Sequence, residues 1–407
     1  MATTGAGEPL FKLVDFSTHL SGPLAGHLLS ELGAELLKVE NVHDGDGNRG
    51  MDPKIDGRGM FHVSLSGGAR SLAISKRSPH WAEVVQAAVE WADAVMVGGR
   101  PEDVARLGLA YEDLAAHNDR LVYCLITGYG EAGPWRDYPA HGQQPDALAG
   151  LLPVEWIDGL PETPPGWRST CTTLAGTMAA LGVMAGLRRA EREERPQYVH
   201  ASLWGAAVWW NWRDLNTYAS LGEGWPDYRV MGSRYAMYPT ADERAILLCP
   251  IERKFWESTC DLLGLPDELK ERGDWERSRM DFGLGPVYDG EREAIAAAMR
   301  TRPLDEWVAA LEERGIPFAP ILNWVEAMES EHAAANGVMR ETTTVEGNVA
   351  KVVAPPVRVR GGAEIDRAEQ RWPRMPAAPE LGADTVAVLE ELGLDAAAAA
   401  VEDGRLK

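Results

Sequence analysis

The sequence has few cysteines and no long apolar run. Its cysteines are Cys124, Cys171, Cys249 and Cys260, and none forms a CxxC pair or a Cys/His cluster. This spacing argues against a structural metal site or a disulfide framework, so we expect reduced, mostly buried thiols and no metal. The longest weakly polar stretch, 174–187, is shorter than the roughly 20 residues of a membrane-spanning helix. The first residues, MATTGAGEP, lack the basic and apolar blocks of a secretory signal, and we expect a cytoplasmic protein with no membrane partner.

Basic residues are also scarce. Lys and Arg number 40 against 62 Asp and Glu, which gives a formal net charge of -22. A chain this acidic is a poor partner for nucleic acid or an anionic membrane. The acidic excess is small in residues 1–100, with nine Lys and Arg against twelve Asp and Glu. An anionic ligand is therefore repelled less by this region than by the rest of the chain. The length of 407 residues, 45% of them apolar, suits a globular protein of two or three structural units.

The N-terminal stretch LFKLVDFSTHLSGPLAGHLLSELGAELLKVE predicts a β-α-β unit. Residues 10–16 form a short, mostly apolar run that is typical of a buried strand. Apolar residues at helical spacing follow from 21 to 32, with Pro23 in the first turn and Gly33 at the exit. A second strand is expected at 35–39. Such a unit builds a parallel sheet covered by helices, and the free amides that begin its helix face the crevice above the strand ends, where an anion binds.

Further strands and helices alternate downstream. We expect strands at 71–74, 94–97 and 121–126, and helices at 81–92 and 101–107. This alternation extends the parallel sheet begun at the N-terminus.

Two loops are candidates for ligand contact. The glycine- and charge-rich stretch 41–59 has no periodicity, and a loop this long in an α/β domain is more often functional than idle. After the strand at 94–97, Gly98 and Gly99 let the backbone approach a ligand, and Arg100 offers a planar cation at the carboxyl end of the strand. A solvent-exposed loop arginine explains Arg100 equally well.

Several segments together resemble one protein family. Their order and spacing are similar to those of the class III CoA-transferases: DFSTHLSGPLAGHLLSELGAELLKVE, GGARSLAISK, GGRPEDVARLGLAYEDL and LVYCLITGYGEAGPWRDYPA. That family includes formyl-CoA transferase, carnitine CoA-transferase and α-methylacyl-CoA racemase. The resemblance continues through TMAALGVMAGL, QYVHASLWGA, KFWESTCDLLGLPD, RPLDEWVAALEERGIPFAPILNWVEAM and VAPPVRV, and so covers almost the whole chain.

The resemblance implies an α/β fold with two domains. A Rossmann-like large domain with a parallel sheet would comprise residues 1–228 and 324–407, and a smaller domain would comprise 229–323. It also implies an interlocked dimer, in which each subunit threads through a ring made by the other. The tryptophans of the helix expected at 204–212 would then serve the dimer interface or an ordinary core.

The resemblance also implies that loops of the large domain hold CoA, and that the protein transfers CoA from an acyl-CoA to a carboxylic acid. The phosphates of CoA call for arginine forks and free helix amides. The residues at matching positions are Lys76, Arg100 and Arg106 for the nucleotide phosphates, and Thr18, His19, Leu20 and Ser21 for the thioester end.

The chain departs from the family at the nucleophile. In the family an aspartate attacks the acyl-CoA and forms first a mixed anhydride and then an aspartyl-CoA thioester, so that one difficult exchange becomes two easier ones. Here the sequence reads WRSTCTTLAGTMAALG, and Cys171 or Thr172 takes the place of the aspartate, depending on one gap. No acidic residue lies between Glu162 and Glu191.

Three interpretations stay open. In the first, another carboxylate, Asp146, reaches the site, although a solvated turn residue after Pro145 is the simpler interpretation. In the second, the protein is a racemase or isomerase in which His141 is the base, Glu252 orients it, and Cys171 is the opposing acid unless it is a buried structural cysteine. In the third, the chain is a non-catalytic CoA-binding subunit of a heteromer whose partner supplies the aspartate.

Other family signatures are altered as well. Gly98 and Gly99 stand where asparagine and phenylalanine are usual, and His200 in QYVHASL stands where an acidic residue is usual. The glycine-rich loop that closes over the intermediate is reduced to about Gly232. The C-terminal stretch 380–407 predicts an amphipathic helix with a frayed end.

Overall fold

The computed structural model describes residues 8–222, 232–273, 275–276, 278–359 and 372–402. The chain divides into two compact units, one of Met1–Asn216 with Glu331–Lys407 and one of Thr217–Ser330. The domain limits expected at 228 and 323 stay a prediction. Among the described residues, no helix has both the length and the apolar character that crossing a membrane requires.

The first unit is built on a six-stranded parallel sheet with the strand order β10-β7-β6-β1-β2-β5. This is the order of a Rossmann fold, in which the direction of winding reverses between the first and fourth strands along the chain, here β1 and β6. The α/β class and the parallel sheet expected from the sequence are thereby confirmed. The strands are β1 Phe11–Asp15, β2 Ala34–Glu40, β5 Arg70–Ala73, β6 Ala94–Gly98, β7 Val122–Thr127 and β10 Gln197–Ser202.

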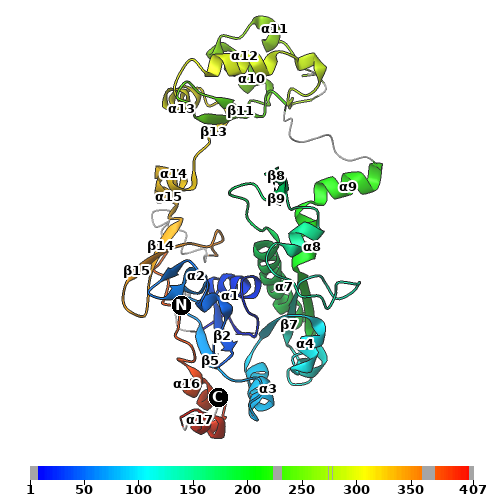
Figure 1. Ribbon diagram of the computed structural model, residues 1–407, viewed down its shortest axis with the longest axis vertical. Helices are drawn as coiled ribbons and strands as arrows, with labels where there is room; N and C mark the ends of the chain where they lie inside the picture. The colour runs from blue at the N-terminus through cyan, green and yellow to red at the C-terminus, as the bar shows by residue number, and fades with distance from the viewer. Residues whose placement is uncertain (1–7, 223–231, 274, 277, 360–371, 403–407) are drawn as a thin grey trace. The chain divides into compact units, whose positions relative to one another are not determined.

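Helices cover both faces of this sheet (Figure 1). On one face, α1 (Ser21–Glu31) packs against α7 (Cys171–Glu193), and a Cβ added to Gly176 of α7 would lie 2.5 Å from Ser21 O. The helices on the other face are α3 Trp81–Trp91, α4 Pro101–Arg106, α5 Tyr111–Ala115, α16 Thr385–Glu391 and α17 Asp395–Glu402. The absence of a side chain at Gly176 therefore brings the start of α1 close to the second turn of α7.

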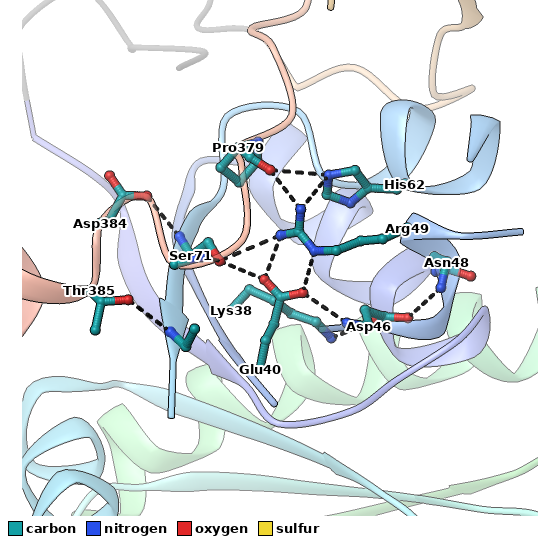
Figure 2. Close-up of polar contacts among 12 residues, drawn as sticks. Lys38, Glu40, Asp46, Asn48, Arg49, His62, Ser71, Pro379, Asp384 and Thr385 are labelled. Atoms are coloured by element: carbon teal, nitrogen blue, oxygen red, sulfur yellow. Dashed lines mark hydrogen bonds and ion pairs between the residues drawn. The ribbon is translucent and has the colours of Figure 1, made fainter. Parts of the chain in front are cut away.

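The C-terminal segment covers the exposed edge of β5 (Figure 2). The Ser71 amide donates to Asp384 Oδ2 at 2.8 Å, and the Ala73 amide donates to Thr385 Oγ1 at 3.0 Å. These side chains take the place of a neighbouring strand. The single amphipathic helix expected at the C-terminus is wrong, because α16 and α17 are separated at Gly393 by a left-handed φ of 75°. The expected frayed end, 403–407, lies outside the described residues.

The connections of the first unit hold short elements, several of which the sequence did not indicate. The stretch 41–59, expected to be irregular, contains a 3-10 turn and a small hairpin, because Asp46 caps the turn and β3 pairs with β4. The remaining elements are η1 Gly47–Arg49, β3 Lys54–Ile55, β4 Arg58–Gly59, α2 Met60–Leu65, α6 Gln144–Leu148, β8 Glu155–Ile157, β9 Leu160–Glu162, α8 Leu203–Trp210, α9 Trp212–Leu221, α15 Glu331–Asn336, β14 Met339–Thr343 and β15 Val349–Val353. Of these, α9 crosses the limit between the two units.

The second unit is a three-stranded antiparallel sheet with helices around a tryptophan-rich core. Trp256 and Trp307 are buried in that core, and the buried Arg234 pairs with Glu291 at 2.9 Å. Its elements are β11 Ala236–Pro239, β12 Ala245–Leu248, α10 Arg253–Leu263, α11 Asp267–Lys270, η2 Pro286–Tyr288, α12 Glu291–Met299, α13 Leu304–Glu313, β13 Phe318–Pro320 and α14 Trp324–Glu329.

Candidate active site

The candidate site lies where the winding of the sheet reverses, at the carboxyl ends of β1 and β6. In open α/β sheets a ligand binds in the crevice outside the strands at this point. The loops after β1 and β6 are in contact here, because a Cβ added to Gly98 would lie only 2.9 Å from the Ser17 Cβ. A side chain at position 98 would therefore push the loop after β1 away from the end of β6, and glycine allows the two to meet.

The first turn of α1 presents free amides at this crevice. The first intrahelical bond runs from Leu24 N to Leu20 O, so the amides of Ser21 and Gly22 precede it. No side chain caps this helix, and its first turn contains no acidic residue. The positive end of the helix dipole is thus not neutralised by a side-chain cap or by an acidic residue of the first turn.

The predicted cations follow strands that end at the same edge of the sheet, but they differ in exposure and in the acidic partners they already have. Arg100 precedes α4, 38% of its side chain is exposed, and its Nε lies 2.5 Å from Asp103 Oδ2. Arg106 is 70% exposed and pairs with the other oxygen of Asp103. Lys76 lies beyond the end of β5 with its side chain exposed, and partial desolvation of its ammonium lowers its pKa. Since β5 and β6 are separated by two strands, the two ends lie roughly 14 Å apart, a spacing suited to an extended ligand.

Two predicted catalytic residues, Asp146 and Cys171, meet at the start of α7. The Cys171 amide donates to Asp146 Oδ1 at 3.0 Å, and the Ser169 hydroxyl donates to Asp146 Oδ2 at 2.6 Å. Asp146 is 0% exposed, so the expectation of a solvated turn residue is wrong. The reason is that its carboxylate caps the N-terminus of a long helix.

The Cys171 thiol is buried beside this carboxylate. Its Sγ donates to Gly142 O at 3.2 Å. Burial, with the nearby Asp146 carboxylate, raises the pKa of Cys171 to about 12. The thiol is therefore protonated at neutral pH, which suits a packed cysteine better than a nucleophile.

His141 and Glu252 are placed on different units. His141 is exposed in the segment just before Gly142, and a Cβ added to Gly128 would lie 2.3 Å from the Ala140 Cβ, so this segment touches the loop after β7. Glu252 directly precedes α10 in the second unit, where its backbone forms a β-bridge with Met280. The pairing of His141 with Glu252 stays a prediction.

Comparison with known proteins identifies the family. The model of CoA-transferase family III matches residues 11–385 of the chain. The protein belongs to CoA-transferase family III.

Some relatives of this chain match it over nearly their whole length, and another matches it over about half. The chain is 23% identical to acetyl-CoA:oxalate CoA-transferase of Acetobacter aceti, over 93% of this chain and 94% of that protein. It is 31% identical to the beta subunit of succinyl-CoA–L-malate CoA-transferase of Chloroflexus aurantiacus, over 47% of this chain and 48% of that one. A crystal structure of Rv3272 from Mycobacterium tuberculosis has the same fold, with a TM-score of 0.76 at 22% identity over 93% of this chain and 97% of that chain.

The donor set at the crevice fits the polyanionic substrate of a family III CoA-transferase. Uncapped amides and a guanidinium are the groups that bind phosphate in proteins. Within the described part of the chain, no cluster of three or more His, Cys, Asp or Glu side chains is arranged to hold a metal. A cavity of about 210 Å³ opens at the amino ends of β2 and β5, lined in part by Arg70 and Arg340, but it lies at the opposite edge of the sheet.

Sequence analysis missed a polar cluster on the strands β7 and β10. His200 Nε2 lies 3.0 Å from Thr127 Oγ1, and His200 Nδ1 lies 3.4 Å from Glu131 Oε2. The Glu131 carboxylate can only accept, so a neutral imidazole carries its proton on Nδ1 and its Nε2 accepts from the Thr127 hydroxyl, which in turn accepts from the Gly130 amide. Burial lowers the pKa of His200, against the effect of Glu131. The unusual histidine in QYVHASL was the available signal.

Sequence analysis also missed charged residues buried beneath the loop after β1. Lys38 on β2 lies 2.8 Å from Asp15 Oδ2 and 3.2 Å from Asp46 Oδ2, and all three side chains are buried. The signal was the alternation of Lys38 and Glu40 in the otherwise apolar strand LLKVE.

Proposed function

We propose that the protein binds an acyl-CoA at the carboxyl edge of its parallel sheet and transfers CoA to a carboxylic acid. Family membership supports this reaction class. The observation that carries the proposal is the reversal of the sheet's winding between β1 and β6, where the uncapped start of α1 and Arg100 follow the carboxyl ends of these strands and offer donors to an anion.

In this proposal the nucleotide half of CoA lies across the loops that follow β5 and β6. Arg100, Arg106 and Lys76 bind its phosphates by charge-assisted hydrogen bonds. The segment Thr18–Ser21 receives the thioester end, so the reacting carbonyl comes toward the start of α7, whose second turn packs on Ser21.

The carboxylate assigned to nucleophilic attack is Asp146, because it is the acidic side chain at the N-terminus of α7. Asp146 Oδ2 gives up its hydrogen bond from the Ser169 hydroxyl and attacks the carbonyl carbon of the thioester. This attack forms a mixed anhydride and releases CoA thiolate. The thiolate then attacks the Asp146 carbonyl and releases the donor acid. The acceptor carboxylate attacks the resulting aspartyl thioester and displaces CoA thiolate, which gives a second anhydride between Asp146 and the acceptor. The thiolate then attacks the acceptor carbonyl of this anhydride, which forms the new CoA ester and frees the Asp146 carboxylate.

Two linked measurements test this proposal. Isotope-labelled free acid should enter the CoA ester pool when protein, acyl-CoA and the matching acid are mixed. Hydroxylamine added during turnover should convert the attacking carboxylate to a hydroxamate, mapped by mass spectrometry to the peptide that contains Asp146. A control with Asp119→Asn should leave this trapping unchanged, because Asp119 is exposed just before the amino end of β7. Label exchange without modification of Asp146 would remove that residue from the mechanism.

A second function is favoured by the buried state of Asp146. A carboxylate that is 0% exposed and accepts two hydrogen bonds serves a helix cap well without reacting. The relative from Chloroflexus aurantiacus is named as a beta subunit. The chain would then be the CoA-binding, non-catalytic subunit of a heteromer. No label exchange by the purified protein, with exchange restored by a co-expressed homologue, is the result expected for this alternative.

The racemase alternative uses the exposed His141 as base and the protonated Cys171 thiol as the opposing acid. It requires exchange of the α-proton of the acyl group. Deuterium uptake at the α-carbon in heavy water, with no exchange of labelled acid, would favour it over CoA transfer. His141→Ala should abolish that uptake.

The proposed assembly is an interlocked homodimer or a heteromer with a homologous subunit. Trp209, Trp210 and Trp212 are 59%, 62% and 51% exposed in the single chain, which argues for an interface rather than a core. Sedimentation should give a particle of at least twice the mass of 44.4 kDa. A stable monomer at micromolar concentration would contradict this assembly.

A further inference from the structure

The loop after β1 contains a residue in an unusual backbone conformation. His19 has a φ of 68°, in the left-handed region that non-glycine residues seldom adopt. Its amide donates to Asp46 Oδ1 at 2.9 Å, and Asn48 Nδ2 donates to its carbonyl oxygen. Both backbone groups of His19 are thus bound by one turn, η1 and its cap, from the next β-α connection.

Asp46 is itself held from the strands below. Its amide donates to Glu40 Oε1 at 3.0 Å, and its Oδ2 faces the Lys38 ammonium at 3.2 Å (Figure 2). The same ammonium donates to Asp15 Oδ2 at 2.8 Å and to Ser17 O. The buried Lys38 ammonium therefore links Asp15, at the end of β1, and Ser17, in the loop after it, to Asp46.

The Lys38 ammonium is held by groups of the protein itself. It donates to Asp15 Oδ2 and Ser17 O, and it forms an ion pair with Asp46 Oδ2. Burial alone lowers the pKa of Lys38, but the carboxylates of Asp15 and Asp46 outweigh it and raise that pKa. A buried charge that is fully paired supports the loop above it rather than binding substrate.

We infer that Asp46 is a positioning residue for CoA: its carboxylate fixes the left-handed turn at His19 and so sets the direction in which residues 18–21 face the ligand. This inference rests on the proposed CoA-binding function of that loop. Residues in strained conformations persist where the surrounding structure holds them, and such positions cluster at ligand-binding sites.

Two substitutions separate positioning from plain support of the fold. In Asp46→Asn, the amide oxygen stays toward the His19 and Asn48 amides. The reverse orientation would set the side-chain NH₂ against two N–H donors, whereas this one sets it against the Lys38 ammonium alone, which keeps Asp15 and Ser17 as acceptors. This variant therefore loses the ion pair with Lys38 but keeps the bond to His19. Asp46→Ala loses both. Both variants should unfold at lower urea concentration than the wild type, since a buried ammonium loses a counter-charge in each.

The experiment measures the dissociation constant of CoA by calorimetry in the full-length protein. We expect Asp46→Ala to weaken binding by about tenfold or more, because the loop loses its fixed direction, and Asp46→Asn to stay close to the wild type. Asp44→Asn is the matched control, since Asp44 is exposed and accepts a hydrogen bond from the Asn41 side chain. Equal weakening in Asp46→Ala and Asp46→Asn, or none in either, would overturn the inference.

Hydrogen exchange separates failure of this inference from failure of the proposed function. Amides 18–21 should exchange faster in Asp46→Ala than in Asp46→Asn, with or without CoA. A wild type that binds no CoA would reject the proposed function and with it the positioning of CoA, while the exchange rates would still report on the turn at His19. If Asp46→Ala does not fold, Asn48→Ala removes the other bond to His19 and should weaken CoA binding in the same way.

Discussion

At the scale of single residues, Arg100 is the cation on which the proposed CoA site depends most. It stands at the crevice with its guanidinium half-exposed and bound to Asp103. We expect Arg100→Ala to weaken CoA binding by about 1–3 kcal/mol, because a charge-assisted contact to phosphate is lost. Calorimetric titration with CoA measures this. Arg120→Ala is the control, because Arg120 precedes the amino end of β7 and its guanidinium pairs with Glu194. Unchanged affinity in Arg100→Ala would remove Arg100 from the site.

The buried thiol gives a second prediction. Cys171→Ser should leave CoA transfer unchanged and alter the free energy of unfolding by only about 1 kcal/mol, because a serine hydroxyl donates to Gly142 O as the thiol does. Turnover assays and urea unfolding of the same preparations measure both effects. A collapse in turnover with normal unfolding would show that the thiol takes part in the reaction.

The sequence indicated which residues to consider here but not how each is used. It pointed to Asp146 and Cys171, and these two do meet. It could not show that Asp146 is buried, because that burial depends on Ser169 and Cys171, which fold over it from more than 20 residues away. Lys38 escaped notice for the same reason, since its counter-charges lie on β1 and on the turn at Asp46.

At the scale of elements, the edge of β5 depends on two side chains from the C-terminal segment. We expect Thr385→Val to lower the free energy of unfolding by about 1–3 kcal/mol, because the buried Ala73 amide loses its acceptor while the shape of the side chain is kept. Urea denaturation measures this change. Thr177→Val on the exposed side of α7 is the control and should change stability by less than about 0.5 kcal/mol. Equal effects of the two substitutions would mean that Thr385 does not protect the edge.

Elements with local signals were predictable, and those fixed by distant contacts were not. The strands β1, β2, β5, β6 and β7 lie within one or two residues of their predicted limits, because each is an apolar run bounded by polar or glycine residues. The break between α16 and α17 was missed, because the helical pattern continues across Gly393. The turn at 47–49 was missed as well, because its cap, Asp46, is fixed by contacts to His19 and Lys38.

At the scale of the whole molecule, stability should fall in mildly acidic solution. Burial lowers the pKa of His27 and of His62 to about 4. Because the folded protein binds these protons less readily than the unfolded chain, the free energy of unfolding should decrease as pH falls from 6.5 to 4, by roughly 3 kcal/mol for each histidine. Below pH 4.5, Glu40 adds to this, since bonds from Arg49 and Ser71 outweigh its burial and lower its pKa to about 2.

Urea midpoints measured between pH 8 and pH 4 test this pH dependence. His62→Gln should flatten part of the profile between pH 6.5 and 4, because its titration is removed. His43→Gln is the control, since His43 is exposed, and it should follow the wild-type profile. A midpoint that stays constant down to pH 4 would contradict the burial of neutral His27 and His62.

The most direct test of CoA binding at the carboxyl edge of the sheet is hydrogen exchange of the wild-type protein with and without saturating CoA. Amides of residues 17–24 and 98–106 should exchange more slowly when CoA is bound, because these segments flank the crevice between β1 and β6. Protection confined to other segments, such as those around the cavity at the amino ends of β2 and β5, or no protection at all, would contradict it.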